Sequence, residues 1–171
     1  KFWPSNTPAI TEIQVKQAFQ MVNQVFPYTQ KVSPEQPIEI LLFDAQHDAL
    51  NGATTACFEP GGIWGCICMY RMQEETPSPV AVLLHELGHL LHIRGTGAID
   101  QVPPSFVTYL RRLGAQTDAL TIPQLQDVFA DTFMLAVMSQ HPELEVPIPG
   151  LSDQVLRASY QYIQAFFDEI A

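Results

Sequence analysis

The sequence predicts an α+β fold. Helical periodicity comes first, three short segments of strand character follow, and the remaining segments have helical patterns separated by proline and glycine. No internal repeat, low-complexity tract or domain linker interrupts this order. We therefore expect one domain over residues 1–171, with a sheet-containing part at about 1–77 and a helical part at about 78–171.

The first part of the chain is expected to hold one helix and then strands. Residues 11–14 resemble a capping box, and apolar residues then recur at helical spacing until Pro27. Residues 38–43 are rich in β-branched and apolar side chains, which is typical of a strand. Two more strands are expected at 53–58 and 63–70, joined by a turn rich in proline and glycine.

Four helices are expected after residue 77. The first follows Ser78, a candidate N-cap, and ends near Gly97. A short helix is expected at 105–113. A longer one should follow the N-cap candidate Thr121 and run to about residue 140, and the last should follow Ser152 and run to about residue 170.

Composition and charge narrow the class of protein. Hydrophobic residues make up 47% of the chain and charged residues 15%, which is typical of a globular protein. The net charge of −10 argues against nucleic acid or an anionic membrane as a partner. No apolar run is long enough to span a bilayer. The sequence begins at Lys1 rather than methionine, which suggests an exported, processed protein or an excised domain, and localisation is otherwise not predicted.

Three cysteines occur within twelve residues: Cys57, Cys66 and Cys68. A hairpin would bring one pair together, and the odd count leaves one thiol free. A disulfide would imply an oxidising compartment, whereas reduced, buried thiols are equally compatible with the sequence. The disulfide state therefore stays open.

The strongest functional signal is the pentapeptide His85-Glu86-Leu87-Gly88-His89. On a helix, side chains four residues apart share one face, so His85 and His89 present two imidazoles that suit a single zinc ion. Glu86 lies beside the same face and is placed to take a proton from a zinc-activated water. The flanking residues are almost all apolar, and polar groups buried among them need a partner. We therefore expect a zinc site.

A catalytic zinc usually has three protein ligands and one open position. Asp127 and Asp131 lie four residues apart on a predicted helix with otherwise apolar surroundings. We expect Asp127 to be the third ligand, and Asp131 to accept a hydrogen bond from the outward N–H of a zinc-bound histidine. The alternative is that both are solvated carboxylates. Asp131 or Asp100 could replace Asp127 as the ligand.

Three other candidates are weaker. His92 continues the face of the two motif histidines, but it lies two turns from His85 and is better explained as a structural or supporting residue. Cys66 or Cys68 would pair with the motif as in peptide deformylase, but the spacing is much shorter than in that family and its glycine-rich motif is missing.

The two motifs together resemble the zincin metallopeptidases, and most closely the gluzincin branch, whose second motif is Glu-x-x-x-Asp. The segment around Ala130, Asp131 and Phe133 is also similar to the ImmA/IrrE-type and HELGH families. The resemblance implies a small antiparallel or mixed sheet packed against the motif helix, followed by a mostly helical part. It also implies zinc ligands at His85, His89 and Asp127, with Glu86 as general base and Asp131 supporting a ligand.

This chain departs from the gluzincin pattern at one position. Asp127 is one methylene shorter than the family's glutamate, so the second helix must approach more closely or another residue must ligate. The metzincin pattern is absent, because it needs Gly at position 92 and His or Asp at position 95, where this chain has His92 and Gly95. The resemblance covers two short motifs and the order of elements.

The function predicted from these residues is zinc-dependent hydrolysis of peptide bonds in a peptide or protein substrate. The strand at 63–70, with Trp64 and Tyr70, is a candidate edge for an extended substrate. His141, Tyr109 and Arg94 are candidate oxyanion stabilisers, although each is more typical of a structural role. The alternatives are a zinc-dependent small-molecule amidase or deformylase, favoured by a closed pocket, and an inactive zinc-binding regulatory module. The oligomeric state is not predicted.

Overall fold

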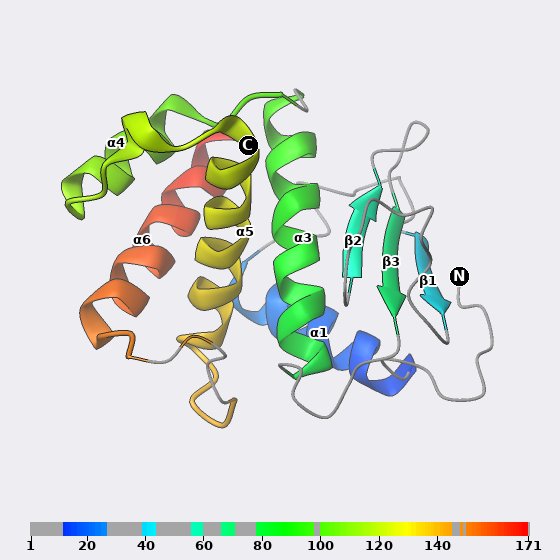
Figure 1. Ribbon diagram of the computed structural model, residues 1–171. Helices are drawn as coiled ribbons and strands as arrows, with labels where there is room; N and C mark the ends of the chain where they lie inside the picture. The colour runs from blue at the N-terminus through cyan, green and yellow to red at the C-terminus, as the bar shows by residue number, and fades with distance from the viewer. Residues whose placement is uncertain are drawn as a thin grey trace.

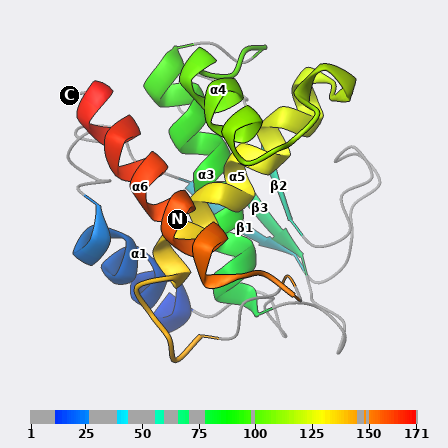
Figure 2. The same cartoon turned by 90° about the vertical axis from the view of Figure 1, so that its left-hand side faces the viewer.

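The computed structural model describes helices on one side of the molecule and three short strands on the other (Figure 1). Helix α3 lies between the strands and α5, and α6 lies on the far side of α5. Seen from the side of α6, the strands lie behind these helices (Figure 2). The structure describes residues 12–26, 39–43, 56–59, 66–70, 78–97, 100–144, 148 and 150–170.

The five described α-helices lie where the sequence predicts them. Their ends agree with the expected proline, glycine and serine or threonine signals to within a few residues, so these helix predictions are confirmed. The helices are α1 (Glu12–Val25), α3 (Pro79–Thr96), α4 (Pro104–Arg112), α5 (Ile122–Met138) and α6 (Asp153–Glu169), and a 3-10 turn spans Thr117–Ala119.

The three strands are β1 (Glu39–Phe43), β2 (Ala56–Glu59) and β3 (Cys66–Tyr70). Their order is β1-β3-β2, with β3 parallel to β1 and antiparallel to β2, so the sheet is mixed. In this register Cys57 lies opposite Cys68. The cysteine side chains lie outside the described residues, so a disulfide stays a prediction.

The α+β fold class, with a sheet as the basis of a zincin fold, is wrong. Helices hold most of the described residues, and the strands are only four or five residues long. Ile67 of β3 is completely buried and belongs to the same core as the helices. The physical reason is that such short strands offer few inward-facing positions, whereas α3 and α5 bury apolar side chains along most of their length.

The core is therefore formed by helices packed on helices. Apolar residues of α3 and α5 meet along their length, α6 packs against α5, and α1 packs mainly against α3. Four phenylalanines are among the largest fully buried side chains, which are Phe106, Phe129, Phe133 and Phe167. None of the described helices combines the length and the apolar content that crossing a membrane requires.

The two helices that carry the motifs begin differently. Thr121 caps α5 in a capping box: its hydroxyl accepts a hydrogen bond from the Gln124 backbone N–H, and the Gln124 side chain accepts one from the Thr121 N–H. Such a cap contributes about 1 kcal/mol and fixes where the helix begins. Ser78 occupies the N-cap position of α3 as expected, but its side chain makes no capping hydrogen bond there. Pro79 at the first helical position favours the start of α3 instead.

Candidate metal centre

Helix α3 positions the first motif by burying the residues on either side of it. Leu84, Leu87 and Leu91 are completely buried in the core, which fixes the rotation of the helix about its axis. His85 and His89 lie one turn apart on a face that is only partly covered. The helix ends at Gly97, whose left-handed backbone lets its N–H bond to the Ile93 carbonyl.

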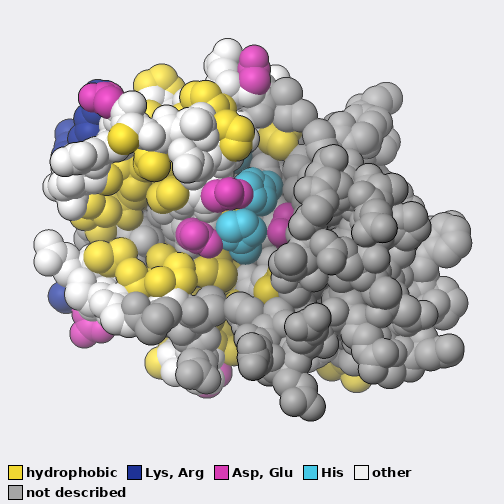
Figure 3. Space-filling model, viewed as in Figure 1, with side chains coloured by type: hydrophobic (Ala, Val, Ile, Leu, Met, Phe, Trp, Pro, Cys, Tyr) yellow, Lys and Arg dark blue, Asp and Glu magenta, His cyan; other side chains and the backbone are white. Residues whose placement is uncertain are grey.

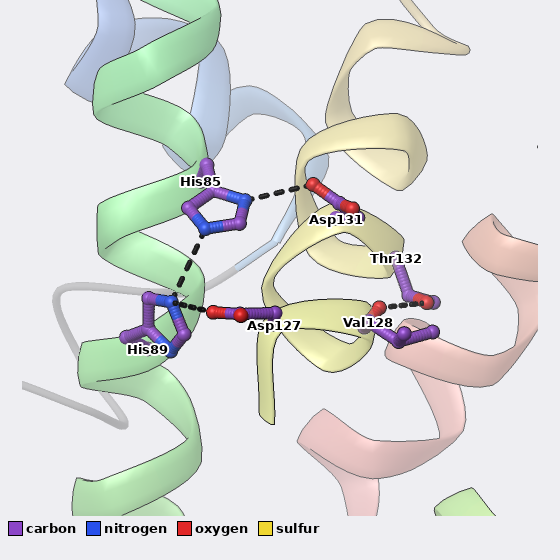
Figure 4. Close-up of polar contacts among 6 residues, drawn as sticks. All are labelled: His85, His89, Asp127, Val128, Asp131 and Thr132. Atoms are coloured by element: carbon purple, nitrogen blue, oxygen red, sulfur yellow. Dashed lines mark hydrogen bonds and ion pairs between the residues drawn. The ribbon is translucent and has the colours of Figure 1, made fainter. Parts of the chain in front are cut away.

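Helix α5 presents the second motif towards the same point. Its Phe129 and Phe133 are fully buried, whereas Asp127 and Asp131 lie on a more exposed face one turn apart. Figure 4 shows both aspartates reaching from α5 towards the two histidines of α3. Two helices that are adjacent in space but about 40 residues apart in sequence thus form one cluster.

Three of these side chains converge on one small volume. The Nε2 atoms of His85 and His89 are 3.2 Å apart, and Nε2 of His89 is 3.3 Å from Oδ1 of Asp127. One ligand atom from each of the three residues lies within 4.8 Å of the others. Tetrahedral zinc with bonds of about 2.0–2.2 Å would separate its ligand atoms by roughly 3.3–3.5 Å. The two short separations are therefore compatible with one metal ion held by the three residues, and zinc stays a prediction from the sequence.

Asp131 contacts the other nitrogen of His85. The distance from His85 Nδ1 to Asp131 Oδ1 is 2.8 Å, so the Nδ1–H of His85 donates to this carboxylate. With the proton held on Nδ1, the lone pair of Nε2 points towards His89 and Asp127. This is the arrangement in which a carboxylate orients a metal-binding imidazole and raises its basicity.

Glu86 is buried beside the cluster. Its side chain is only 6% exposed, and Oε2 has no hydrogen-bond partner among the described residues. Burial, followed by repulsion from Asp127, raises the pKa of Glu86 to about 7, against an opposing effect of His85. An orphaned buried carboxylate of this kind is costly unless a cation or a bound water lies next to it.

The surroundings of His85 and His89 shift the pKa values of the two imidazoles in opposite directions. Burial, and then the neighbouring His85 and His92, lower the pKa of His89 to about 3, which leaves its imidazole neutral and able to ligate. Burial by itself lowers the pKa of His85, but the hydrogen bond to Asp131 and the nearby carboxylates raise it overall. Burial also raises the pKa of Asp127. A bound cation would act against this effect of burial on the two carboxylates, because it favours their charged forms.

The cluster reaches the surface of the molecule. Figure 3 shows histidine and acidic side chains together in a hollow bordered by apolar side chains. The Asp127 side chain is 66% exposed, while those of His85 and His89 are 23% and 17% exposed. The ligand atoms are therefore open on the face that Asp127 occupies.

Two alternative ligands lie apart from the cluster. Asp100 is exposed and does not belong to the group of possible ligands. His92 is 1% exposed, and its ring packs edge-on against Phe129 with centroids 5.5 Å apart. The Gln101 backbone also contacts His92, although burial dominates and lowers its pKa. His92 thus belongs to the core, in line with the structural role expected for it.

The candidate oxyanion stabilisers are engaged elsewhere or are not described. His141 Nδ1 lies 3.0 Å from Glu143, and the Tyr109 hydroxyl lies 3.3 Å from the Ser159 hydroxyl in contact with α6. The side chains of Arg94, Trp64, Tyr70, Cys66 and Cys68 lie outside the described residues.

One residue of the motif has a role that the sequence analysis did not assign. A Cβ atom built on Gly88 would lie 2.7 Å from the Cα of Ala130, far inside van der Waals contact. The signal was present in the sequence, because an isolated glycine inside a helix weakens it and so usually has a packing reason. What could not be read was which helix packs against it.

Comparison with known proteins adds no family. Neither a protein-family model nor a curated protein matches the chain. The resemblance to the zincins therefore stays a prediction from two short motifs, and function has to be argued from the site itself.

Proposed function

We propose that this protein is a zinc-dependent metallopeptidase. The observation that carries the proposal is the convergence of His85 Nε2, His89 Nε2 and Asp127 Oδ1 beside the unpartnered carboxylate of Glu86. A site that only stabilised structure would have four closed ligands and no use for a buried acid. Three ligands with an adjacent acid support a hydrolytic role.

The donor set favours zinc among the common metals. Two imidazoles and one carboxylate are the mixed nitrogen and oxygen ligands that zinc accepts, whereas calcium and magnesium prefer oxygen alone. When bound, zinc would supply a Lewis acid that polarises a carbonyl and lowers the pKa of water. His85, His89 and Asp127 would hold it, and Asp131 would keep the proton of His85 on Nδ1.

Glu86 would move the proton in the reaction. Glu86 directly follows the ligand His85 and is buried beside the cluster, where its carboxylate would lie next to a water on the metal. Its carboxylate would accept a proton from the attacking water and pass it to the leaving amine. The absence of a hydrogen-bond partner for Oε2 among the described residues leaves that oxygen available for this transfer.

A peptide is the substrate class that the open face supports best. The exposure of Asp127 and the hollow in Figure 3 support a substrate that reaches the site from the surface. An enclosed pocket would instead have favoured a small amide. The net charge of −10 is compatible with neutral or basic peptides.

The test compares the wild type with Glu86→Gln. The metal-free protein is reloaded with one equivalent of zinc and incubated with a mixture of unblocked and end-blocked peptides, and cleavage is followed by mass spectrometry. Because the amide cannot accept the proton, Glu86→Gln should retain zinc but lose roughly 10²- to 10⁴-fold in hydrolysis.

The matched control is Glu169→Gln, the same chemical change at an exposed position on α6, which should leave hydrolysis unchanged. Equal cleavage by wild type and Glu86→Gln would remove Glu86 as the base. No zinc-dependent cleavage of any peptide by the wild type would contradict the proposed function.

A further inference from the structure

Among the glycines that the structure describes, Gly88 has the closest neighbours, and they belong to α5, which packs against α3 at this position. A Cβ atom there would lie 2.7 Å from Ala130 Cα, 2.9 Å from the Ala130 carbonyl oxygen and 3.2 Å from Phe133 Cβ. The two nearest atoms belong to backbone, so they cannot rotate away as the end of a side chain would. Any larger residue at position 88 must push the two helices apart.

The backbone of Gly88 does not itself require glycine. Its φ is not in the left-handed region, which Gly97, Gly114 and Gly150 occupy among the described glycines. Glycine inside a helix is less stable than alanine, because it loses more conformational freedom on folding. The close contact with Ala130 is therefore what the structure gains from glycine at this position.

This contact lies inside the metal centre. Gly88 directly precedes His89 on α3, and Ala130 directly precedes Asp131 on α5. The close contact is thus next to His89 on one helix and next to Asp131 on the other, and Figure 4 shows the polar side chains of the two helices facing one another. The helix separation at this point sets how far a side chain of α5 must extend to reach the histidines.

We infer that Gly88 is a positioning residue that fits the metal centre to an aspartate as its third ligand. Asp127 has one methylene less than glutamate, yet its Oδ1 lies 3.3 Å from Nε2 of His89. The short side chain reaches because the backbone of α5 is drawn close where Gly88 leaves room. A glutamate at position 127 would be too long for this spacing, and an alanine at position 88 would make the aspartate too short.

The inference rests on the proposed zinc site and is tested by zinc affinity, which needs no substrate. Zinc is titrated into the metal-free protein in competition with a chromophoric chelator, for wild type, Gly88→Ala, Asp127→Glu and the double variant. Each single change should weaken zinc binding at least about 10-fold, as changes in the supporting shell of a metal site do. The double variant should bind zinc more tightly than either single variant, because the longer side chain spans the wider gap.

A purely structural role for Gly88 would not produce this rescue. If the double variant binds no more tightly than Gly88→Ala, or if Asp127→Glu alone matches the wild type, the inference is overturned. If Gly88→Ala does not fold, the comparison of Asp127→Glu with the wild type still tests the inference. Affinities that follow the expected pattern without any peptide cleavage would refute the proposed function and leave this inference standing. A wild type that binds no zinc would overturn both.

Discussion

Helix α5 has two sides of opposite chemistry. Towards α6 it contributes to an aromatic cluster, in which Phe129 packs edge-on against Phe166 with centroids 5.3 Å apart. The stacked pair of Phe26 and Phe167, with centroids 5.1 Å apart, belongs to the same hydrophobic core. On the side that faces His85 and His89 of α3, α5 presents Asp127 and Asp131. Helix α5 therefore lies between an apolar core and the cluster of histidine and aspartate side chains.

The comparison shows where stability and function reside. Full burial of a phenylalanine contributes about 1.5–3 kcal/mol. A buried polar group without a partner, such as Oε2 of Glu86, costs about 1–3 kcal/mol. Each region can therefore be altered separately: the apolar core should govern folding and the polar face should govern metal binding.

The largest effect on folding is expected from Phe167→Ala. Phe167 is 2% exposed and stacks on Phe26, so truncation should lower the free energy of unfolding by about 3–5 kcal/mol. Zinc affinity of the folded fraction should stay within about threefold of wild type, because the residue lies in the apolar core and not at the site. Urea unfolding and zinc titration at low temperature measure the two quantities.

The control for this change is Ile13→Ala. Ile13 is 78% exposed, and its truncation should change the free energy of unfolding by no more than about 0.5 kcal/mol. Equal effects of the two truncations would show that the apolar core does not carry the stability assigned to it.

The next effect is a pH dependence that belongs to Glu86. Its pKa is raised to about 7 in the folded protein from an ordinary value of 4.5, so its favourable contribution is complete below pH 4.5 and is lost as the pH rises through 7. Glutamine does not titrate. In metal-free protein, Glu86→Gln should therefore gain stability over the wild type by roughly 3 kcal/mol between pH 4.5 and pH 8. Chemical unfolding at several pH values measures the difference in free energy of unfolding between the two proteins. A difference that does not change with pH would show that burial does not raise the pKa of Glu86.

A smaller effect is expected when only the orienting carboxylate is changed. Asp131→Asn keeps an oxygen near His85 Nδ1 but removes its charge, so zinc affinity should fall by roughly 10- to 100-fold. Asp118→Asn is the matched control, because Asp118 pairs with Arg111 on the surface and should not affect zinc. Identical zinc affinities for the two variants would exclude Asp131 as a supporting residue.

Much of the helical structure was predictable because its signals are local. The capping threonine at position 121 and the left-handed Gly97 act within one turn of the helix that they begin or end. The grouping of Asp127 with the two motif histidines was also expected, because carboxylates spaced by one helical turn among apolar residues need a partner.

Other features depend on contacts between distant segments. The pairing of the apolar faces of α3 and α5 could not be read from local patterns, because it joins segments far apart in the sequence. The approach of Gly88 to Ala130 joins positions 42 residues apart, and no periodicity within either helix records it. The isolation of Glu86 Oε2 is likewise a property of the packed site.

Anomalous diffraction at the zinc edge, from crystals of zinc-loaded protein, tests the proposed metal centre most directly. We predict one peak at full occupancy, bonded at about 2.0–2.2 Å to Nε2 of His85, Nε2 of His89 and a carboxylate oxygen of Asp127. No peak between α3 and α5, or a peak whose protein ligands do not include Asp127, would contradict it.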